Sequence, residues 1–303
     1  MQHQLAIGID LGGTNIKAVL INADGSILAE AIRPTHDQPG KDNSAVWKQT
    51  VKELVQQLQQ QAGRPVEKAG IAAPGTANTE NTAILSLPNR LLGIENLVWK
   101  DYLAIDTLVL NDAHAALFAE SRIGAGKIAQ NIVMLTLGTG VGGGIMLNGQ
   151  ILQGQMGRAG HIGHISVTDD LEQSIAQAPG SLERAIGECT IRERTYGKYT
   201  STEALVKAYL AGDAFAAWAW LNSVHKLSRG LVSLINLVSP DLIILSGGIT
   251  QAAKALLEPL HQFMDLYEWR IKGFETPIVV AQSNTFSGAI GAALFALEKN
   301  SIS

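Results

Sequence analysis

The sequence predicts an α/β protein built from two related halves, on three observations. Short apolar runs with the length of buried strands alternate with longer stretches whose apolar residues recur at helical spacing. An order of strand, glycine-rich turn, strand, tight turn and strand occurs near the N-terminus and again near the middle of the chain. The 303 residues exceed the length at which a single core usually stops growing, so we expect two domains.

The first copy of this order lies at the N-terminus. Apolar runs predict three strands, over residues 5–10, 16–22 and 26–32. A turn centred on Gly12-Gly13 separates the first two, and Asp24-Gly25 is a strong tight-turn signal before the third.

The second copy begins about halfway along the chain. Its predicted strands cover residues 131–137, 144–147 and 150–153. The glycine-rich turn 138–144 separates the first two, and Asn148-Gly149 forms the tight turn. The two copies share a pattern rather than identical residues, which indicates a duplicated fold.

Helices fill the intervals between these strands. Apolar residues have helical spacing over residues 44–62, 113–122, 214–238 and 287–297. No proline-rich or serine-rich linker marks a boundary, so we place it after the strand 107–110. The predicted domains are residues 1–118, with a C-terminal helix at about 287–303 packing back on them, and residues 119–286.

Composition excludes several classes of protein. The chain is 46% hydrophobic and carries a net charge of −4, which indicates a packed globular protein with no electrostatic affinity for nucleic acid. The apolar stretch 231–249 is interrupted by Asn236, Pro240 and Asp241, so we do not expect a membrane span. The N-terminus lacks the pattern of a signal peptide, which predicts a cytoplasmic protein. Cys189 is the only cysteine, so no intramolecular disulfide can form.

Three glycine-rich turns, each after an apolar strand, are candidate phosphate sites. Glycine lets backbone N–H groups approach an anion closely, and the Thr14 hydroxyl and Lys17 ammonium add donors. One such turn alone more often serves only to reverse the chain, but three together indicate a bound nucleotide. Neither the P-loop spacing nor the Rossmann context is present. The candidate nucleotide residues are Gly12, Gly13, Thr14, Lys17, Gly138, Thr139, Gly140, Gly247 and Gly248.

Two aspartates have both a chemical and a structural interpretation. Asp112 follows the strand 107–110, where a carboxylate can accept a hydroxyl proton during phosphoryl transfer. Alternatively, Asn111 or Asp112 simply caps the following helix. Asp10 can orient water around Mg²⁺ beside the first glycine turn, or it can merely end its strand.

His161 and His164 form a His-x-x-His pair in which a glycine precedes each histidine. Such a pair can bind metal, but a closed zinc site needs about four ligands and no further ligand has a recognisable spacing. Polar contacts to a ligand are therefore the favoured interpretation.

These segments together resemble the ROK (repressor, open reading frame, kinase) family of sugar kinases, within the actin-like, ribonuclease-H-like ATPase superfamily. The matching stretches follow the family's order and cover most of the chain: residues 10–17, 73–78, 87–89, 110–115, 137–144, 160–164, 179–183 and 245–248. The resemblance implies a duplicated ribonuclease-H-like α/β fold, with two domains around a central cleft that binds ATP, Mg²⁺ and a sugar.

The resemblance also implies individual roles. Asp112 corresponds to the catalytic base, the turns at Gly12 and Gly138 hold the ATP phosphates, and Gly247-Gly248 lies against the adenosine. The residues at sugar-binding positions are Gly75, Asn89, Asn111, His161, His164 and Glu183, with Asn78 close by.

Two departures from the family pattern matter. His161 stands where the family usually has glutamate, so the sugar preference is open. Many members carry three cysteines before the residue that matches Glu183, and residues 165–182 contain none, so we expect no structural zinc.

The predicted function is ATP-dependent phosphorylation of a glucose-like hexose at its 6-hydroxyl. One alternative is a sugar-binding regulatory ROK protein without turnover; the family's repressors carry an N-terminal helix-turn-helix domain, for which a strand starting at residue 5 leaves no room. Another alternative is a plain ATPase. A homodimer is common in the family and is kept as an expectation.

Overall fold

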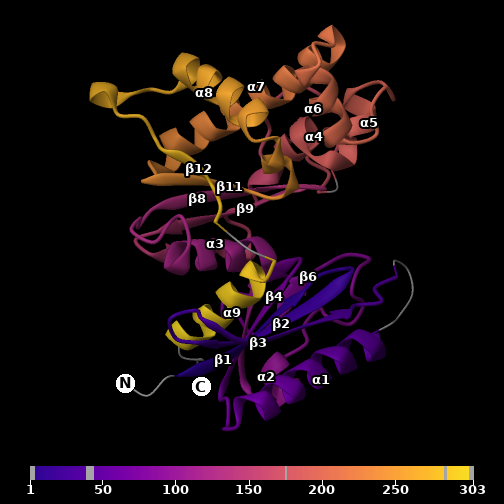
Figure 1. Ribbon diagram of the computed structural model, residues 1–303, viewed down its shortest axis with the longest axis vertical. Coiled ribbons are helices and arrows are strands. Elements are labelled where there is room, and N and C mark those ends of the chain that lie inside the picture. Colours follow the sequence, from indigo (N-terminus) through magenta and orange to yellow (C-terminus); the bar gives the residue numbers. More distant parts are fainter. Residues whose placement is uncertain (1–3, 39–43, 175, 283–284, 300–303) are drawn as a thin grey trace. The chain divides into compact units, whose positions relative to one another are not determined.

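The computed structural model describes residues 4–38, 44–174, 176–282 and 285–299. These residues form two compact units (Figure 1). Unit 1 comprises Met1–Ile128, Ile151–Ala159 and Gln282–Ser303, and unit 2 comprises Ala129–Gln150 and Gly160–Ala281. The units differ from the domain limits expected from the sequence, because unit 1 continues past residue 118 and includes a short excursion at residues 151–159.

Unit 1 contains a five-stranded sheet with the order β3-β2-β1-β4-β7. The strands are β1 (Leu5–Leu11), β2 (Asn15–Asn22), β3 (Ile27–Pro34), β4 (Lys68–Ala73) and β7 (Asp106–Asn111). β2 is antiparallel to both β1 and β3, whereas β4 runs parallel to both β1 and β7. The three predicted N-terminal strands are therefore present. β4 was not predicted, because its alanine-rich and glycine-rich sequence has low strand propensity.

Helices cover both faces of this sheet (Figure 1). The helices of unit 1 are α1 (Ser44–Ala62), α2 (Trp99–Leu103), α3 (Asp112–Ile123) and α9 (Ser287–Glu298). Gly8 and Gly70 are paired on β1 and β4, and a Cβ at either would overlap a backbone carbonyl of α9. Ile7 and Ile9 point to the other face and share a buried cluster with Leu54 of α1. Residues 300–303, which were expected to extend the last helix, lie outside the described residues.

Smaller elements complete unit 1. β5 (Thr76–Ala77) and β6 (Ile84–Ser86) form a two-stranded sheet, and a 3₁₀ turn, η1 (Gln155–Gly157), packs beside β5.

Unit 2 repeats the strand order of unit 1 as β10-β9-β8-β11-β12. The strands are β8 (Ile132–Leu137), β9 (Val141–Leu147), β10 (Gln150–Ile151), β11 (Leu242–Ser246) and β12 (Ile278–Val280). The glycine turn is shorter than predicted: Gly142, Gly143 and Gly144 belong to β9, because they pair with β8. Common ancestry of the two halves stays a prediction.

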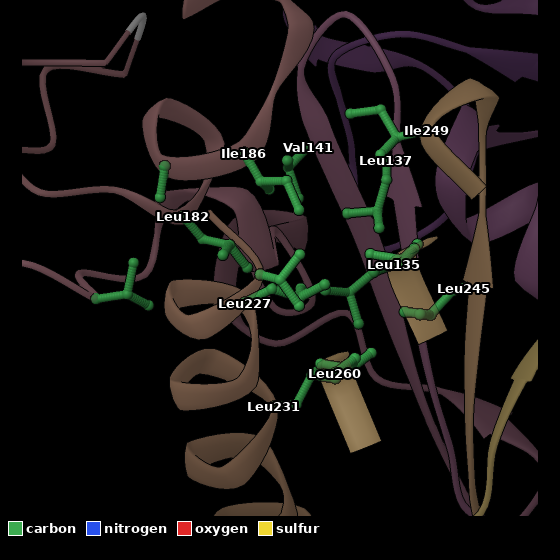
Figure 2. Close-up of a cluster of buried hydrophobic side chains, with 14 of the residues drawn as sticks. Leu135, Leu137, Val141, Leu182, Ile186, Leu227, Leu231, Leu245, Ile249 and Leu260 are labelled. Atoms are coloured by element: carbon green, nitrogen blue, oxygen red, sulfur yellow. The ribbon is translucent and has the colours of Figure 1, made fainter. Parts of the chain in front are cut away.

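The core of unit 2 lies between its sheet and helices. The elements are α4 (Leu182–Ile186), α5 (Ile191–Arg194), α6 (Thr202–Leu210), α7 (Ala214–Val238) and α8 (Lys254–Tyr267), with 3₁₀ turns η2 (Ile162–His164), η3 (Glu188–Thr190), η4 (Gly248–Ala252) and η5 (Ile271–Gly273). Figure 2 shows Leu227 and Leu231 of α7 packed with Leu135 of β8 and Leu182 of α4. α7 has the predicted limits. In the described part of the chain, no helix has the length and apolarity needed to cross a membrane.

Candidate nucleotide and sugar site

The first glycine turn is shaped by a residue that follows β3. Thr35 is fully buried; its backbone N–H donates to the Thr14 carbonyl at 2.9 Å, and its hydroxyl donates to the Gly12 carbonyl at 2.6 Å. In a trans peptide the carbonyl and the next N–H point in opposite directions, so the Gly13 N–H is directed away from Thr35. The Gly13 and Thr14 N–H groups donate to no acceptor among the described residues. The turn therefore presents free N–H groups to an anion.

The second turn is built on the same principle. The N–H groups of Glu188 and Cys189 donate to the carbonyls of Gly138 and Thr139 at 2.9 and 2.8 Å. This orients the N–H groups of Thr139 and Gly140 the opposite way, where the described part of the chain offers them no acceptor. The second turn is thus a second candidate phosphate site.

The third turn lies beside the second. Gly247 has φ +92°, and a Cβ there would overlap the Leu137 carbonyl, so both the conformation and the close approach require glycine. A cavity of about 530 Å³ opens at this place, which is within the usual size range for small-molecule sites. It is lined by Gly138, Thr139, Glu188, Thr202, Glu203, Val206, Lys207, Leu210, Gly248, Ile249, Gln251 and Ala252.

The junction of β7 and α3 separates the roles of Asn111 and Asp112. The Asn111 side chain caps α3 by accepting the Ala113 and His114 N–H groups at 2.9 and 3.3 Å, and it donates to the Gly75 carbonyl at 2.9 Å. Asp112 is the first residue of the helix, and its side chain is exposed. Because Asn111 supplies the cap, the Asp112 carboxylate remains accessible for other chemistry.

Asp112 has the electrostatics of a proton acceptor. The side chain of Asp112 is exposed on one side, but many protein atoms surround the carboxyl group. The resulting desolvation raises the pKa of this carboxyl above its ordinary value. A hydrogen bond from the Ala113 N–H and the positive charge of Arg90 oppose this rise. A raised pKa makes a carboxylate a stronger base.

Asp10 lies near the end of β1, opposite Lys17 on β2. Burial raises its pKa from 3.8 to about 6; Lys17 opposes the rise, and the negative charge of Asp112 adds to it. A desolvated carboxylate near a second carboxylate is a favourable place for a cation, so these residues fit Mg²⁺. No group of three or more potential metal ligands occurs among the described residues, so the rest of the coordination shell would come from phosphate and water.

The candidate sugar-binding residues of unit 1 differ in their backbone conformation and in their hydrogen bonds. Gly75 has φ +93°, and its carbonyl accepts the Asn111 amide. Asn89 is exposed and has φ +61°. The Asn78 side chain closes its own turn, because it accepts the N–H groups of Thr82 and Ala83 and donates to the Thr82 hydroxyl. A contact from Asn78 to sugar stays a prediction.

In unit 2, the segment that carries His161 and His164 is joined by a backbone hydrogen bond to the segment that carries Glu183. The Leu182 N–H donates to the Ile165 carbonyl at 2.9 Å, which joins the histidine segment to the start of α4. The two imidazole rings are nearly parallel, with centroids 6.3 Å apart. Glu183 Oε2 accepts the Val141 N–H at 3.1 Å, so the predicted sugar carboxylate also supports the end of the second glycine turn.

Sequence reasoning missed the residues that hold the turns. Thr35, Glu188 and Cys189 carry no motif, because each acts through a hydrogen bond to a turn distant in the chain. Arg90 was also missed, although it is adjacent to the predicted Asn89; its guanidinium lies on Gly13.

The structure combines two α/β units of the same strand order, glycine turns with free N–H groups and a cavity of small-molecule size. These features fit the actin-like ATPase class. The chain belongs to the ROK family, whose sequence model matches residues 6–299.

Known relatives agree with this assignment. A glucokinase of Thermotoga maritima is 31% identical over 277 residues, covering 84% of this chain and 86% of its own. The crystal structure of a ROK hexokinase from Thermus thermophilus has a TM-score of 0.83 and 27% identity, covering 97% of this chain and 98% of its own. That of a Streptomyces griseus ROK glucokinase in complex with glucose and AMPPNP has a TM-score of 0.78 and 25% identity, covering 97% of this chain and 100% of its own.

Proposed function

We propose that this protein is an ATP-dependent hexose kinase that phosphorylates a glucose-like sugar at its 6-hydroxyl. The observation that carries the proposal is the Asn111–Asp112 junction, where Asn111 caps α3 and leaves Asp112 accessible with a raised pKa. Similarity to a glucokinase and to a glucokinase bound to glucose and an ATP analogue supports the same activity.

In the proposed mechanism each of these groups has a separate role. Asp112 accepts the proton of the sugar hydroxyl as its oxygen attacks the γ-phosphorus of ATP. The free N–H groups at Gly13, Thr14, Thr139 and Gly140 bind phosphate oxygens. Mg²⁺, when bound, neutralises phosphate charge, and Asp10 would hold it through water.

Several finer features belong to this proposal. Gly75, Asn89 and Asn111 of unit 1, with His161, His164 and Glu183 of unit 2, contact one sugar in a central cleft, and the cavity beside Gly248 takes the adenosine. The protein is a cytoplasmic homodimer without structural zinc, and it binds neither nucleic acid nor membrane. Light scattering after size exclusion tests the dimer, and elemental analysis tests for zinc.

The activity is tested by ADP release from Mg²⁺-ATP across a panel of hexoses, with a blank that contains no sugar. The panel comprises glucose, mannose, fructose, allose, N-acetylglucosamine and N-acetylmannosamine. We expect release that depends on a glucose-like sugar, and nuclear magnetic resonance should locate the phosphate on carbon 6. Equal release in every well would instead indicate a plain ATPase. Sugar binding without ADP release would indicate a regulator.

A further inference from the structure

Arg90 lies in the segment between β6 and α2, and its guanidinium rests on the first glycine turn. A Cβ built at Gly13 would overlap Arg90 Nη2 and would lie 3.2 Å from Arg90 Cζ. The guanidinium thus occupies the space above Gly13, on the turn whose N–H groups at Gly13 and Thr14 are free. A phosphate bound by those N–H groups would lie beside a permanent positive charge.

The side chain of Asp37 holds Arg90 and the residue that follows it through hydrogen bonds. Its Oδ2 accepts Arg90 Nε at 3.4 Å, and its Oδ1 accepts the Leu91 N–H at 3.1 Å. The Asp37 side chain is 8% exposed, whereas that of Arg90 is 44% exposed. One buried carboxylate therefore holds the inner edge of the guanidinium. The two terminal nitrogens donate no hydrogen bond to the parts of the chain that the structure describes.

The backbone around Arg90 is held in an unusual conformation. Asn89 has φ +61° and Leu91 has φ +43°, a region that residues with a Cβ rarely occupy. Leu91 is fully buried, and Asp37 binds its N–H, so packing and a hydrogen bond maintain this conformation. Strain of this kind concentrates at functional sites, and here it directs one side chain onto the phosphate turn.

Arg90 also acts on the proposed base. Its positive charge lowers the pKa of Asp112, while its guanidinium lies on the turn at Gly13. In the proposed mechanism the γ-phosphoryl group moves from ATP held at the phosphate turns to a sugar whose proton goes to Asp112, so a cation that acts on both groups is placed to act on the transfer.

We propose that Arg90 is a catalytic residue that binds the transferring phosphoryl group, an inference that rests on the proposed kinase activity. The bond between the γ-phosphorus and the bridging oxygen of ATP breaks, the bond from the sugar oxygen to phosphorus forms, and ADP leaves. Asp112 takes the sugar proton, and Arg90 keeps all its protons. Its terminal nitrogens donate to the phosphoryl oxygens, whose charge is then offset in the transition state.

The test compares Arg90→Ala and Arg90→Lys with Arg33→Ala, an exposed arginine of the same unit that contacts Gln57. We expect Arg90→Ala to lower kcat by about 100-fold or more, with the sugar KM changing less than about threefold. Arg90→Lys should retain part of the activity, because lysine keeps the charge and loses the planar fork. Arg33→Ala should match the wild type.

Binding of ADP with aluminium fluoride and glucose, measured by calorimetry, isolates the transition-state contact. Arg90→Ala should weaken this complex by about 30-fold or more and leave the affinity for ADP alone unchanged. Thermal melts check folding, and Arg90→Lys carries the same test if the alanine variant does not fold.

Three results would overturn the inference. The first is a kcat of Arg90→Ala equal to that of the wild type. The second is an equal loss of affinity for ADP alone and for the aluminium fluoride complex, which would show that Arg90 only supports the turn. A loss of kcat that disappears at higher pH would show that Arg90 acts only on the pKa of Asp112. If the wild type itself shows no sugar-dependent ADP release, the proposed function fails and this inference with it.

Discussion

The backbone of Gly288, in the first turn of α9, lies directly on the carboxylate of Asp10. A Cβ built at Gly288 would lie 3.0 Å from Asp10 Cγ and 3.1 Å from Oδ2. Helix α9 therefore forms part of the surroundings of a carboxylate on β1. Protein atoms packed around this carboxylate remove water from it, and this desolvation is the main cause of its raised pKa.

The first prediction concerns this contact. Gly288→Ala should displace the Asp10 carboxylate and raise the KM for Mg²⁺-ATP several-fold. Its stability should change little, because alanine improves helix propensity by up to about 1 kcal/mol and so offsets the crowding. Steady-state kinetics and urea denaturation measure the two effects.

Gly291→Ala is the matched control on the same helix. A Cβ there would overlap the Ala115 carbonyl, so the neighbour is backbone and cannot move aside. The unfolding free energy of this variant should fall by at least about 1–3 kcal/mol. An unchanged KM for Mg²⁺-ATP in Gly288→Ala would contradict the importance of the contact.

The second prediction concerns pH and Asp10. The folded protein keeps this proton up to about pH 6, whereas an ordinary Asp releases it near 3.8, so the folded state binds more protons between these values. The contribution of Asp10 to stability is therefore greatest at low pH and falls as pH rises from about 4 to 7. In buffer without Mg²⁺, Asp10→Asn should raise the unfolding free energy at pH 8 by about 1–3 kcal/mol.

Urea denaturation at pH 4.5 and pH 8 tests this result. The advantage of Asp10→Asn should shrink at the lower pH, and the variant should respond less to added Mg²⁺. A gain that is the same at both pH values would show that desolvation of the charged carboxylate is not its source.

The third prediction concerns Asp112. Asp112→Asn should lower turnover by about 1,000-fold or more while sugar affinity, measured by calorimetry, changes little, because the amide keeps the shape of the side chain and cannot accept the proton. The raised pKa of Asp112 places the acid limb of kcat/KM above pH 3.8. Substantial turnover by the asparagine variant would remove Asp112 from the role of base.

The fourth prediction concerns Thr35. Thr35→Val removes the hydroxyl that donates to the Gly12 carbonyl and should cost about 1–3 kcal/mol of stability. It should also weaken AMPPNP binding, because the peptide that carries the Gly13 N–H is then less firmly oriented. Thr35→Ser keeps the hydroxyl and should restore most of the affinity; equal losses in both variants would argue against the hydrogen bond as the cause.

Local sequence patterns account for much of the fold and part of the site. The limits of α1 and α7 follow from apolar spacing, because a buried helical stripe demands that spacing. The Asn111-Asp112 pair could be placed between a strand and a helix for the same reason, and the three glycine turns could be found from composition. The sequence left open which of Asn111 and Asp112 caps the helix, because both residue types can do so.

Tertiary structure alone decided the rest. The hydrogen bonds of Asn111 to Ala113, His114 and Gly75 settled the capping question, and pairing with β8 drew Gly142–144 into a strand. The N–H groups of the turns are freed by Thr35 and by the segment 188–189, and Arg90 reaches Gly13 through the anchor at Asp37. Each of these depends on contact between segments distant in the chain, and such contacts leave no local spacing in the sequence. The sequence by itself determined which chemical groups are available, and the folded chain determined which of them face one another.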